Sequence, residues 1–174
     1  MFKLILASKS KVRKEILDKH NIEAKVEPST VDEEPIKQSL LKEKASPEII
    51  SKNLAEIKAS RVSQKNFDTL VLGADSVIDL NGELISKPDN REKALSILKK
   101  LNGKVHQLIS SVCISKNGSM TWNYSDKASL TMKHHSDDEL NHYLKNFPSI
   151  MKKTVIRFRK LLMLRKSSKV QALT

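Results

Sequence analysis

The sequence has a single cysteine, Cys113, among its 174 residues, and it has no long apolar run. One cysteine cannot form an internal disulfide, and no cluster of cysteine and histidine indicates a zinc site. No apolar stretch approaches the roughly 18 residues that cross a bilayer. The N-terminal segment MFKLILASKS has neither a long apolar core nor a convincing cleavage site for secretion. We therefore expect a cytoplasmic globular protein.

Signatures of several catalytic classes are also missing. The chain has four glycines, and none belongs to a Walker-type phosphate loop. No Ser-His-Asp or Cys-His arrangement indicates a nucleophile, and Cys113 alternates with apolar neighbours as core residues do. His134 and His135 have no third ligand at a useful spacing. The sequence thus gives no support for a P-loop NTPase, a nucleophilic hydrolase or a zinc enzyme.

The net charge of +12 is concentrated in the last 24 residues. Residues 1–150 carry 24 basic and 20 acidic side chains, whereas residues 151–174 carry eight basic and no acidic ones. We expect one domain over 1–150 and an atypical basic tail over 151–174. Apolar residues among the cations could make the tail an amphipathic helix on an anionic membrane or on nucleic acid. We favour an incidental tail, without contact to a membrane or nucleic acid.

Patterns typical of strands and helices alternate along the chain. With 39% hydrophobic residues, the protein can bury a core. Short apolar runs predict strands at 2–6, 70–80, 105–114 and 121–132, and Asn81-Gly82 predicts a hairpin turn. Helical spacing predicts helices after Ser10, Ser46, Asn90 and Ser136, whereas the polar segment 26–47 predicts a loop with room for one short helix. This order indicates an α/β or α+β fold around a mixed sheet.

The turn from the first strand into the first helix is a candidate phosphate site. It holds Ser8 and Ser10, with Lys11 and Arg13 close behind. A turn that enters a helix presents free backbone N–H groups and the positive end of the helix dipole. The alternative, which spacing alone favours, is that Ser10 only caps the helix and the cations are solvated.

Acidic and basic residues elsewhere are further candidates. Asp75 directly follows an apolar strand, where a desolvated carboxylate needs a metal, a cation or a proton, unless it only bonds a turn amide. The acids at 32–34 could supply a ligand for Mg²⁺ or belong to a solvated loop. Lys58 and Lys87 could reach a phosphate or be ordinary surface lysines. Spacing alone leads to an α/β domain with a potential phosphate site.

Five segments, taken in order, resemble the Maf family of nucleoside triphosphate pyrophosphatases. They are LILASKSKVRKEIL, VDEE, LAEIKAS, LVLGADSVI and SKPDNREKALSILKKLNGKVH. The similarity covers about residues 3–115 and continues more weakly to about residue 147. It implies a two-lobed, ITPase-like α/β fold with a mixed central sheet, flanking helices and a cleft, usually in a homodimer.

The resemblance also implies an activity. Family members hydrolyse nucleoside triphosphates, (d)NTPs, to the monophosphate and pyrophosphate with a divalent metal, Mg²⁺ or Mn²⁺. Several act on non-standard or pyrimidine nucleotides, and the family is linked to septum formation. Carried over residue by residue, Asp75 would be the general base and Glu33 would help hold metal or water. The residues that would contact the substrate phosphates are Ser8, Ser10, Arg13, Lys58 and Lys87.

The chain departs from the family pattern at several points. Val12 stands where members commonly have an arginine linked to base preference, and Ser76 replaces a threonine. Residues 107–111 lack the Thr-Gly pair of many members. After Phe147 the basic sequence replaces the family's Ala-Gly-x-Tyr-x-Ile-Gln-Gly segment, as a frame change or an exchanged C-terminus would. The alternative function is therefore a catalytically impaired Maf-like protein that binds polyanions through its tail.

Overall fold

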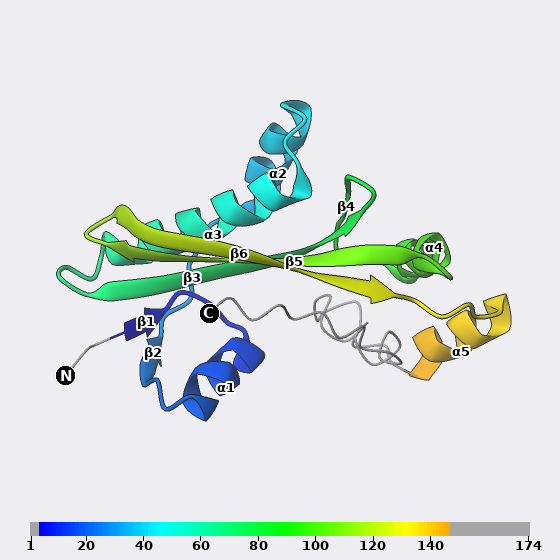
Figure 1. Cartoon of the computed structure of the whole chain (residues 1–174), viewed down its shortest axis with the longest axis horizontal. Helices are drawn as coiled ribbons and strands as arrows, with labels where there is room; N and C mark the ends of the chain where they lie inside the picture. The colour runs from blue at the N-terminus through cyan, green and yellow to red at the C-terminus, as the bar shows by residue number, and fades with distance from the viewer. Residues whose placement is uncertain (1–3, 147–174) are drawn as a thin grey trace, which may run out of the picture. The chain divides into compact units, whose positions relative to one another are not determined.

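The computed structural model describes residues 4–146, which form five helices and six strands (Figure 1). The strands are β1 (Leu4–Leu6), β2 (Ala24–Val26), β3 (Leu70–Leu80), β4 (Glu83–Ile85), β5 (Val105–Lys116) and β6 (Ser119–Thr131). The helices are α1 (Lys11–Lys19), α2 (Glu33–Lys42), α3 (Pro47–Ser63), α4 (Arg91–Leu101) and α5 (Asp137–Asn146). The basic tail predicted over 151–174, and the helix considered for it, lie outside the described residues.

All six strands belong to one mixed sheet, which confirms the predicted fold class. The strand order is β2-β1-β3-β5-β6, and β4 pairs with β3. Strand β1 runs parallel to both β2 and β3, with Leu4 opposite Ala24 on one side and Leu70 on the other. Strands β3 and β4 are antiparallel. Strand β2 was not predicted, since three residues with two exposed side chains carry little apolar signal.

The chain divides into two compact units. The first contains the chain through Ser76 and residues Ile109–Asp126, and the second contains Val77–Leu108 and the chain from Lys127 on. Strands β3, β5 and β6 continue from one unit into the other. In the first unit, one buried apolar cluster joins β1, β3 and α3, and a second joins α3 to Cys113 of β5. The core position predicted for Cys113 is therefore confirmed.

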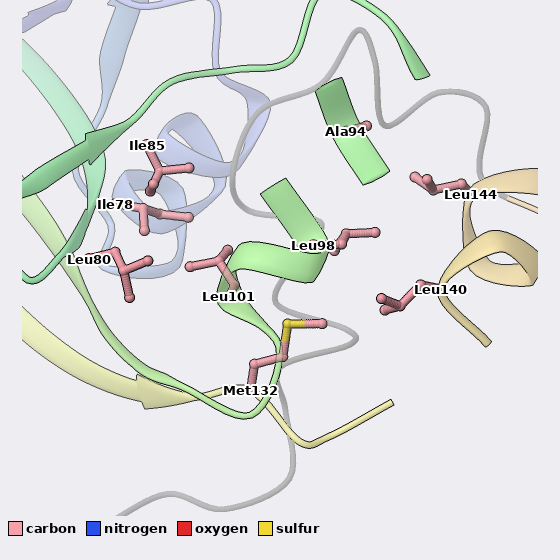
Figure 2. Close-up of a cluster of buried hydrophobic side chains, with 9 residues drawn as sticks. All are labelled: Ile78, Leu80, Ile85, Ala94, Leu98, Leu101, Met132, Leu140 and Leu144. Atoms are coloured by element: carbon pink, nitrogen blue, oxygen red, sulfur yellow. The ribbon is translucent and has the colours of Figure 1, made fainter. Parts of the chain in front are cut away.

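The second unit has the larger apolar core (Figure 2). Helix α4 contributes residues at the spacing of one helical face, and α5 contributes two residues one turn apart. The buried side chains are Ile78, Leu80, Ile85, Ala94, Leu98, Leu101, Met132, Leu140 and Leu144. The helical periodicity of both segments thus predicted their buried faces.

Local end signals act as the sequence predicts. Ser10, Ser46 and Asn90 each cap a helix by accepting a hydrogen bond from a backbone N–H of its first turn. Asn81 and Gly82 have positive φ angles of 53° and 88°, as a two-residue hairpin turn requires. The segment 26–47 differs from the expectation, because it holds the ten-residue helix α2.

Candidate active site

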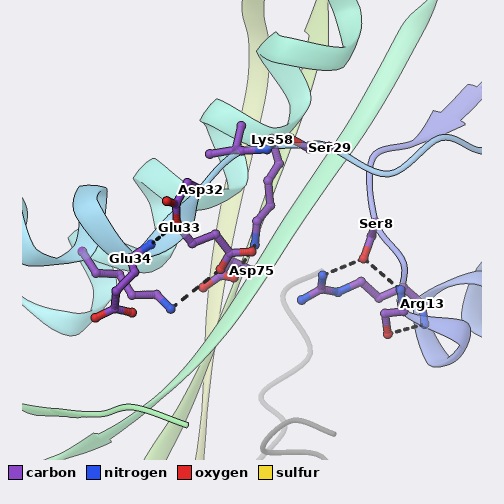
Figure 3. A network of polar contacts seen from close by, with 11 residues as sticks. Ser8, Arg13, Ser29, Asp32, Glu33, Glu34, Lys58 and Asp75 are labelled. Carbon is purple, nitrogen blue, oxygen red and sulfur yellow. Dashed lines mark hydrogen bonds and ion pairs between the residues drawn. The ribbon is translucent and has the colours of Figure 1, made fainter. Parts of the chain in front are cut away.

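The turn between β1 and α1 gathers three of the five residues predicted for phosphate binding. Ser10 caps α1 and accepts a hydrogen bond from the backbone N–H of Arg13 at 3.4 Å. The buried hydroxyl of Ser8 accepts one from the Arg13 Nη1 at 3.0 Å and one from the Ser10 N–H at 3.2 Å. Figure 3 shows the Arg13 side chain bent back toward Ser8. The turn therefore fixes a guanidinium beside the N-terminus of a helix, an arrangement that favours anions.

A close contact between α3 and β3 brings the next two residues together. A Cβ on Gly73 would lie 2.2 Å from the carbonyl oxygen of Ala55 and 2.7 Å from the backbone nitrogen of Ala59. Only glycine on β3 thus permits α3 to approach so closely. Lys58 lies on this part of α3, and Asp75 lies two residues beyond Gly73, on the same face of the strand.

Lys58 and Asp75 form a buried ion pair. The Lys58 Nζ lies 2.8 Å from Asp75 Oδ1, and each residue is 8% exposed. Asp75 lies in the middle of β3, so the alternative of a strand-end aspartate bonded to a turn amide is wrong. A buried carboxylate needs a metal, a cation or a proton as a partner, and Lys58 supplies the cation.

Glu33 is the only one of the three neighbouring acids that contacts Lys58 among the described residues. Its Oε1 lies 2.9 Å from the Lys58 Nζ, so one ammonium bridges Glu33 and Asp75 (Figure 3). Asp32 instead caps α2 by accepting a hydrogen bond from the Glu34 N–H. The Glu34 side chain accepts one from Gln38. The solvated-loop alternative therefore fails for Glu33.

Lys37 is a neighbour of this group that the sequence reasoning did not single out. Its Nζ lies 3.8 Å from Glu33 Oε2, one helical turn along α2, and its side chain is 18% exposed. The two oxygens of Glu33 thus face different lysines. The sequence signal for Lys37 was its spacing of four residues from Glu33. This spacing indicates a contact only if the segment is a helix, and no helix was predicted specifically over these residues.

The electrostatic surroundings shift two pKa values. Burial raises the pKa of the Asp75 carboxyl, Lys58 opposes this shift, Glu33 adds to it, and Arg13 opposes it more weakly. Burial lowers the pKa of the Arg13 guanidinium, whereas Asp75 and Glu33 raise it. Arg13 therefore belongs to the same electrostatic group as the two carboxylates.

Three further candidates make no side-chain hydrogen bond or ion pair with this group within residues 4–146. Lys87 is exposed in the loop between β4 and α4, in the second compact unit, and makes no hydrogen bond or ion pair to another described residue. Ser76 has its hydroxyl 3.1 Å from that of Ser110. Val12 is half-buried on α1. The roles of all three stay predictions.

The carboxylates suit a divalent cation of the Mg²⁺ type. No group of three or more His, Cys, Asp or Glu that could hold a metal occurs within residues 4–146. Mg²⁺, however, commonly takes one or two carboxylates and completes its shell with water and substrate phosphates. Asp75 and Glu33 already share one cation and provide hard oxygen donors, so this donor set fits.

Over residues 4–146, no helix is long and apolar enough to cross a membrane.

Comparison with solved structures supports the fold class. A HAM1 protein from Coxiella burnetii aligns with a TM-score of 0.52 and 15% sequence identity, covering 78% of this chain and 75% of that one. The chain thus shares the α/β fold of that HAM1 protein, and its site combines a carboxylate–lysine centre with a serine–arginine turn.

Comparison of sequences gives the family. The model for Maf-like protein matches residues 3–156, and the chain belongs to this family. A nucleoside triphosphate pyrophosphatase of Pelagibacter ubique (strain HTCC1062) is 67% identical over 142 residues, which are 82% of this chain and 73% of the relative. One of Ruegeria pomeroyi (strain ATCC 700808 / DSM 15171 / DSS-3) is 40% identical, covering 84% and 74%. A 7-methyl-GTP pyrophosphatase of Brucella abortus biovar 1 (strain 9-941) is 37% identical, covering 75% and 66%.

Proposed function

We propose that the protein is a nucleoside triphosphate pyrophosphatase that hydrolyses (d)NTPs to the monophosphate and pyrophosphate. The observation that carries this proposal is the buried Asp75, bridged by Lys58 to Glu33. The names of the relatives support the same activity. A preference for non-standard nucleotides is a finer proposal, in line with the name of the Brucella abortus relative.

In the proposed reaction, Asp75 is the general base. Its carboxylate accepts a proton from a water molecule while the water oxygen bonds to the α-phosphorus. The bond from that phosphorus to the oxygen bridging the α- and β-phosphates breaks, and pyrophosphate leaves with the bond electrons. The raised pKa of Asp75 makes it a stronger base than an ordinary aspartate, provided that it is ionised.

Charge builds on the phosphate oxygens during this step, and fixed cations stabilise it. We assign this role to Arg13 and Lys58, with the hydroxyls of Ser8 and Ser10 and the helix N-terminus orienting the phosphates. The resemblance assigns a phosphate-binding role to Lys87 as well, and we carry this assignment forward as part of the proposal. Asp75 and Glu33 would hold the divalent metal, which when bound adds Lewis-acid stabilisation of the phosphate charge.

Other parts of the proposal concern specificity and setting. Val12 precedes Arg13 and Ser76 follows Asp75 in the sequence, so we propose that both influence which base is preferred. A homodimer, implied by the resemblance, and a cytoplasmic location, expected from the sequence, are carried forward as proposals. The alternative of polyanion binding depends on residues 151–174, outside the described part, and no relative named above supports it.

The proposal is tested by measuring pyrophosphate release from a nucleotide panel with Mg²⁺ or Mn²⁺. We expect Asp75→Asn to lower kcat by about 10²–10⁴-fold, because it removes the base. Asp68→Asn is the matched control, since Asp68 is an exposed aspartate paired with Lys116, and it should keep full activity. A folded wild-type protein that releases no pyrophosphate, or an Asp75→Asn variant with unchanged kcat, overturns the proposal.

A further inference from the structure

The geometry points to an exchange of cations at the carboxylate pair, which we infer from the position of one side chain. Lys58 occupies the divalent-metal position in the nucleotide-free protein and leaves it when metal binds, moving its charge to the substrate phosphates. This inference rests on the proposed function, because it assigns the metal of that reaction to Asp75 and Glu33.

The first argument is the bridging contact itself. A single ammonium nitrogen lies 2.8 Å from Asp75 Oδ1 and 2.9 Å from Glu33 Oε1 (Figure 3). Two carboxylates that approach one point repel each other unless a cation lies between them. Lys58 supplies that cation at the two residues that would hold the metal. Lysine and metal would therefore compete for the same pair of carboxylates.

The second argument is the charge of the group. A divalent cation brings one more positive charge to the two carboxylates than the lysine that it replaces. Lys58 also has a flexible four-carbon stem and a compact charge, so it can move while α3 stays in place. The other oxygen of Glu33 already faces Lys37, at 3.8 Å, so Glu33 does not depend on Lys58 alone for a cation.

The exchange has a consequence for binding. Without nucleotide, Lys58 pairs only with Glu33 and Asp75 among residues 4–146, so metal binding must break these two ion contacts. Triphosphate offers Lys58 new anionic partners, which lowers this cost. Metal and nucleotide should therefore strengthen each other's binding through Lys58, beyond their direct contact.

The test measures Mn²⁺ binding to the nucleotide-free protein by electron paramagnetic resonance of the free ion. We expect Lys58→Met to bind Mn²⁺ at least about tenfold more tightly, because the competing cation is gone. Lys37→Met is the matched control, because it removes the same charge beside Glu33 without a contact to Asp75. It should change the Kd by less than about threefold. Equal effects of the two variants, or no gain for Lys58→Met, overturn the exchange.

A second measurement uses the wild-type protein, in case Lys58→Met does not fold. The ¹³Cε resonance of Lys58, assigned with Lys58→Arg, should shift when Mg²⁺ is titrated without nucleotide. A resonance that stays unchanged at saturating Mg²⁺ overturns the exchange.

The pyrophosphate assay keeps the two proposals separable. Asp75-dependent turnover with unaltered Mn²⁺ affinity in Lys58→Met means that the function is right and the exchange is wrong. Tighter Mn²⁺ binding by Lys58→Met, together with no turnover by the wild type, means that the exchange is right and the proposed function is wrong.

Discussion

At the scale of single residues, Asp75 is placed between opposing influences. Burial disfavours its ionised form and raises its pKa, whereas the Lys58 ammonium favours the ionised form. Burial is the larger effect. A general base gains from this balance, because a more basic carboxylate removes a proton from water more readily. Because the pKa of Asp75 is raised, the reaction should also be more sensitive to acid than one that uses an ordinary aspartate.

The acid limb of kcat/KM therefore tests the environment of Asp75. Since its pKa is raised above the ordinary 3.8, activity should be lost at a higher pH than for an ordinary aspartate. At metal concentrations too low to displace Lys58, Lys58→Met should move the limb to still higher pH, because the cation that stabilises the Asp75 carboxylate is removed. The measurement is the pH dependence of kcat/KM for the wild type and the variant. A limb at the ordinary aspartate value would contradict this prediction.

Stability gives an independent check with a defined sign. Between pH 3.8 and the raised folded-state pKa, the folded protein holds a proton on Asp75 that the unfolded chain has lost. The contribution of Asp75 to stability therefore falls as pH rises through this window. Asp75→Asn removes this dependence, so its free energy of unfolding should rise relative to that of the wild type over the same window. Urea denaturation at several pH values measures it, and parallel curves would argue against a raised pKa.

At the scale of the elements, the contact of α3 with β3 determines the site. Gly73 and the small residues Ala55 and Ala59 let a helix lie directly against a strand. This contact also determines the position of Lys58, because Lys58 lies within the same two turns of α3. Its partner Asp75 is 17 residues away in the sequence. The ion pair therefore depends on a packing distance and not on a local motif.

Gly73→Ala tests this dependence. The added Cβ meets backbone atoms at 2.2 and 2.7 Å, so α3 must shift. We expect a loss of about 1–3 kcal/mol in the free energy of unfolding, as for other overpacked cores. Activity should fall too, because the shift of α3 moves Lys58 away from the phosphate-binding role proposed for it. Thermal denaturation and pyrophosphate release measure both effects.

A double variant identifies the atoms responsible. Ala59→Gly removes a Cβ that lies 2.8 Å from the added methyl group but leaves the backbone contacts in place. It should therefore fail to rescue Gly73→Ala. Full rescue would mean that side-chain crowding, and not backbone approach, excludes larger residues at position 73.

At the scale of the whole molecule, the described chain has two compact units joined by continuous strands. The carboxylate–lysine centre belongs to the first unit, and the larger apolar core belongs to the second. Strands β3, β5 and β6 contribute residues to both. Loss of order in one unit should therefore propagate along these strands into the other.

Leu98→Ala tests whether the units unfold together. Leu98 is fully buried in the second unit, so its truncation should cost about 2–5 kcal/mol. Trp122, the only tryptophan, lies in the first unit and stacks on Tyr124. We expect the unfolding midpoint from Trp122 fluorescence to fall together with that from circular dichroism. An unchanged fluorescence midpoint would show that the units unfold independently.

Much of the fold could be predicted from the sequence because its signals are local. Ser10, Ser46 and Asn90 cap helices through backbone groups three residues away, and Asn81-Gly82 forms its turn alone. Helix α2 was underestimated, because polar residues and prolines obscured it and Asp32 was not considered as its cap. For the site, the sequence predicted the turn at Ser8 and the need of Asp75 for a partner.

By itself, then, the sequence determined most of the strands and helices, several of their ends and the family, since these follow from residues close together in the chain or from motifs in order. Only the tertiary structure decided that Lys58 is the partner of Asp75. It also decided that Glu33, alone of the three neighbouring acids, contacts Lys58, and that the other oxygen of Glu33 faces Lys37. The reason is physical. These contacts depend on the approach of α3 to β3, which the absent side chain of Gly73 permits and which no local spacing encodes.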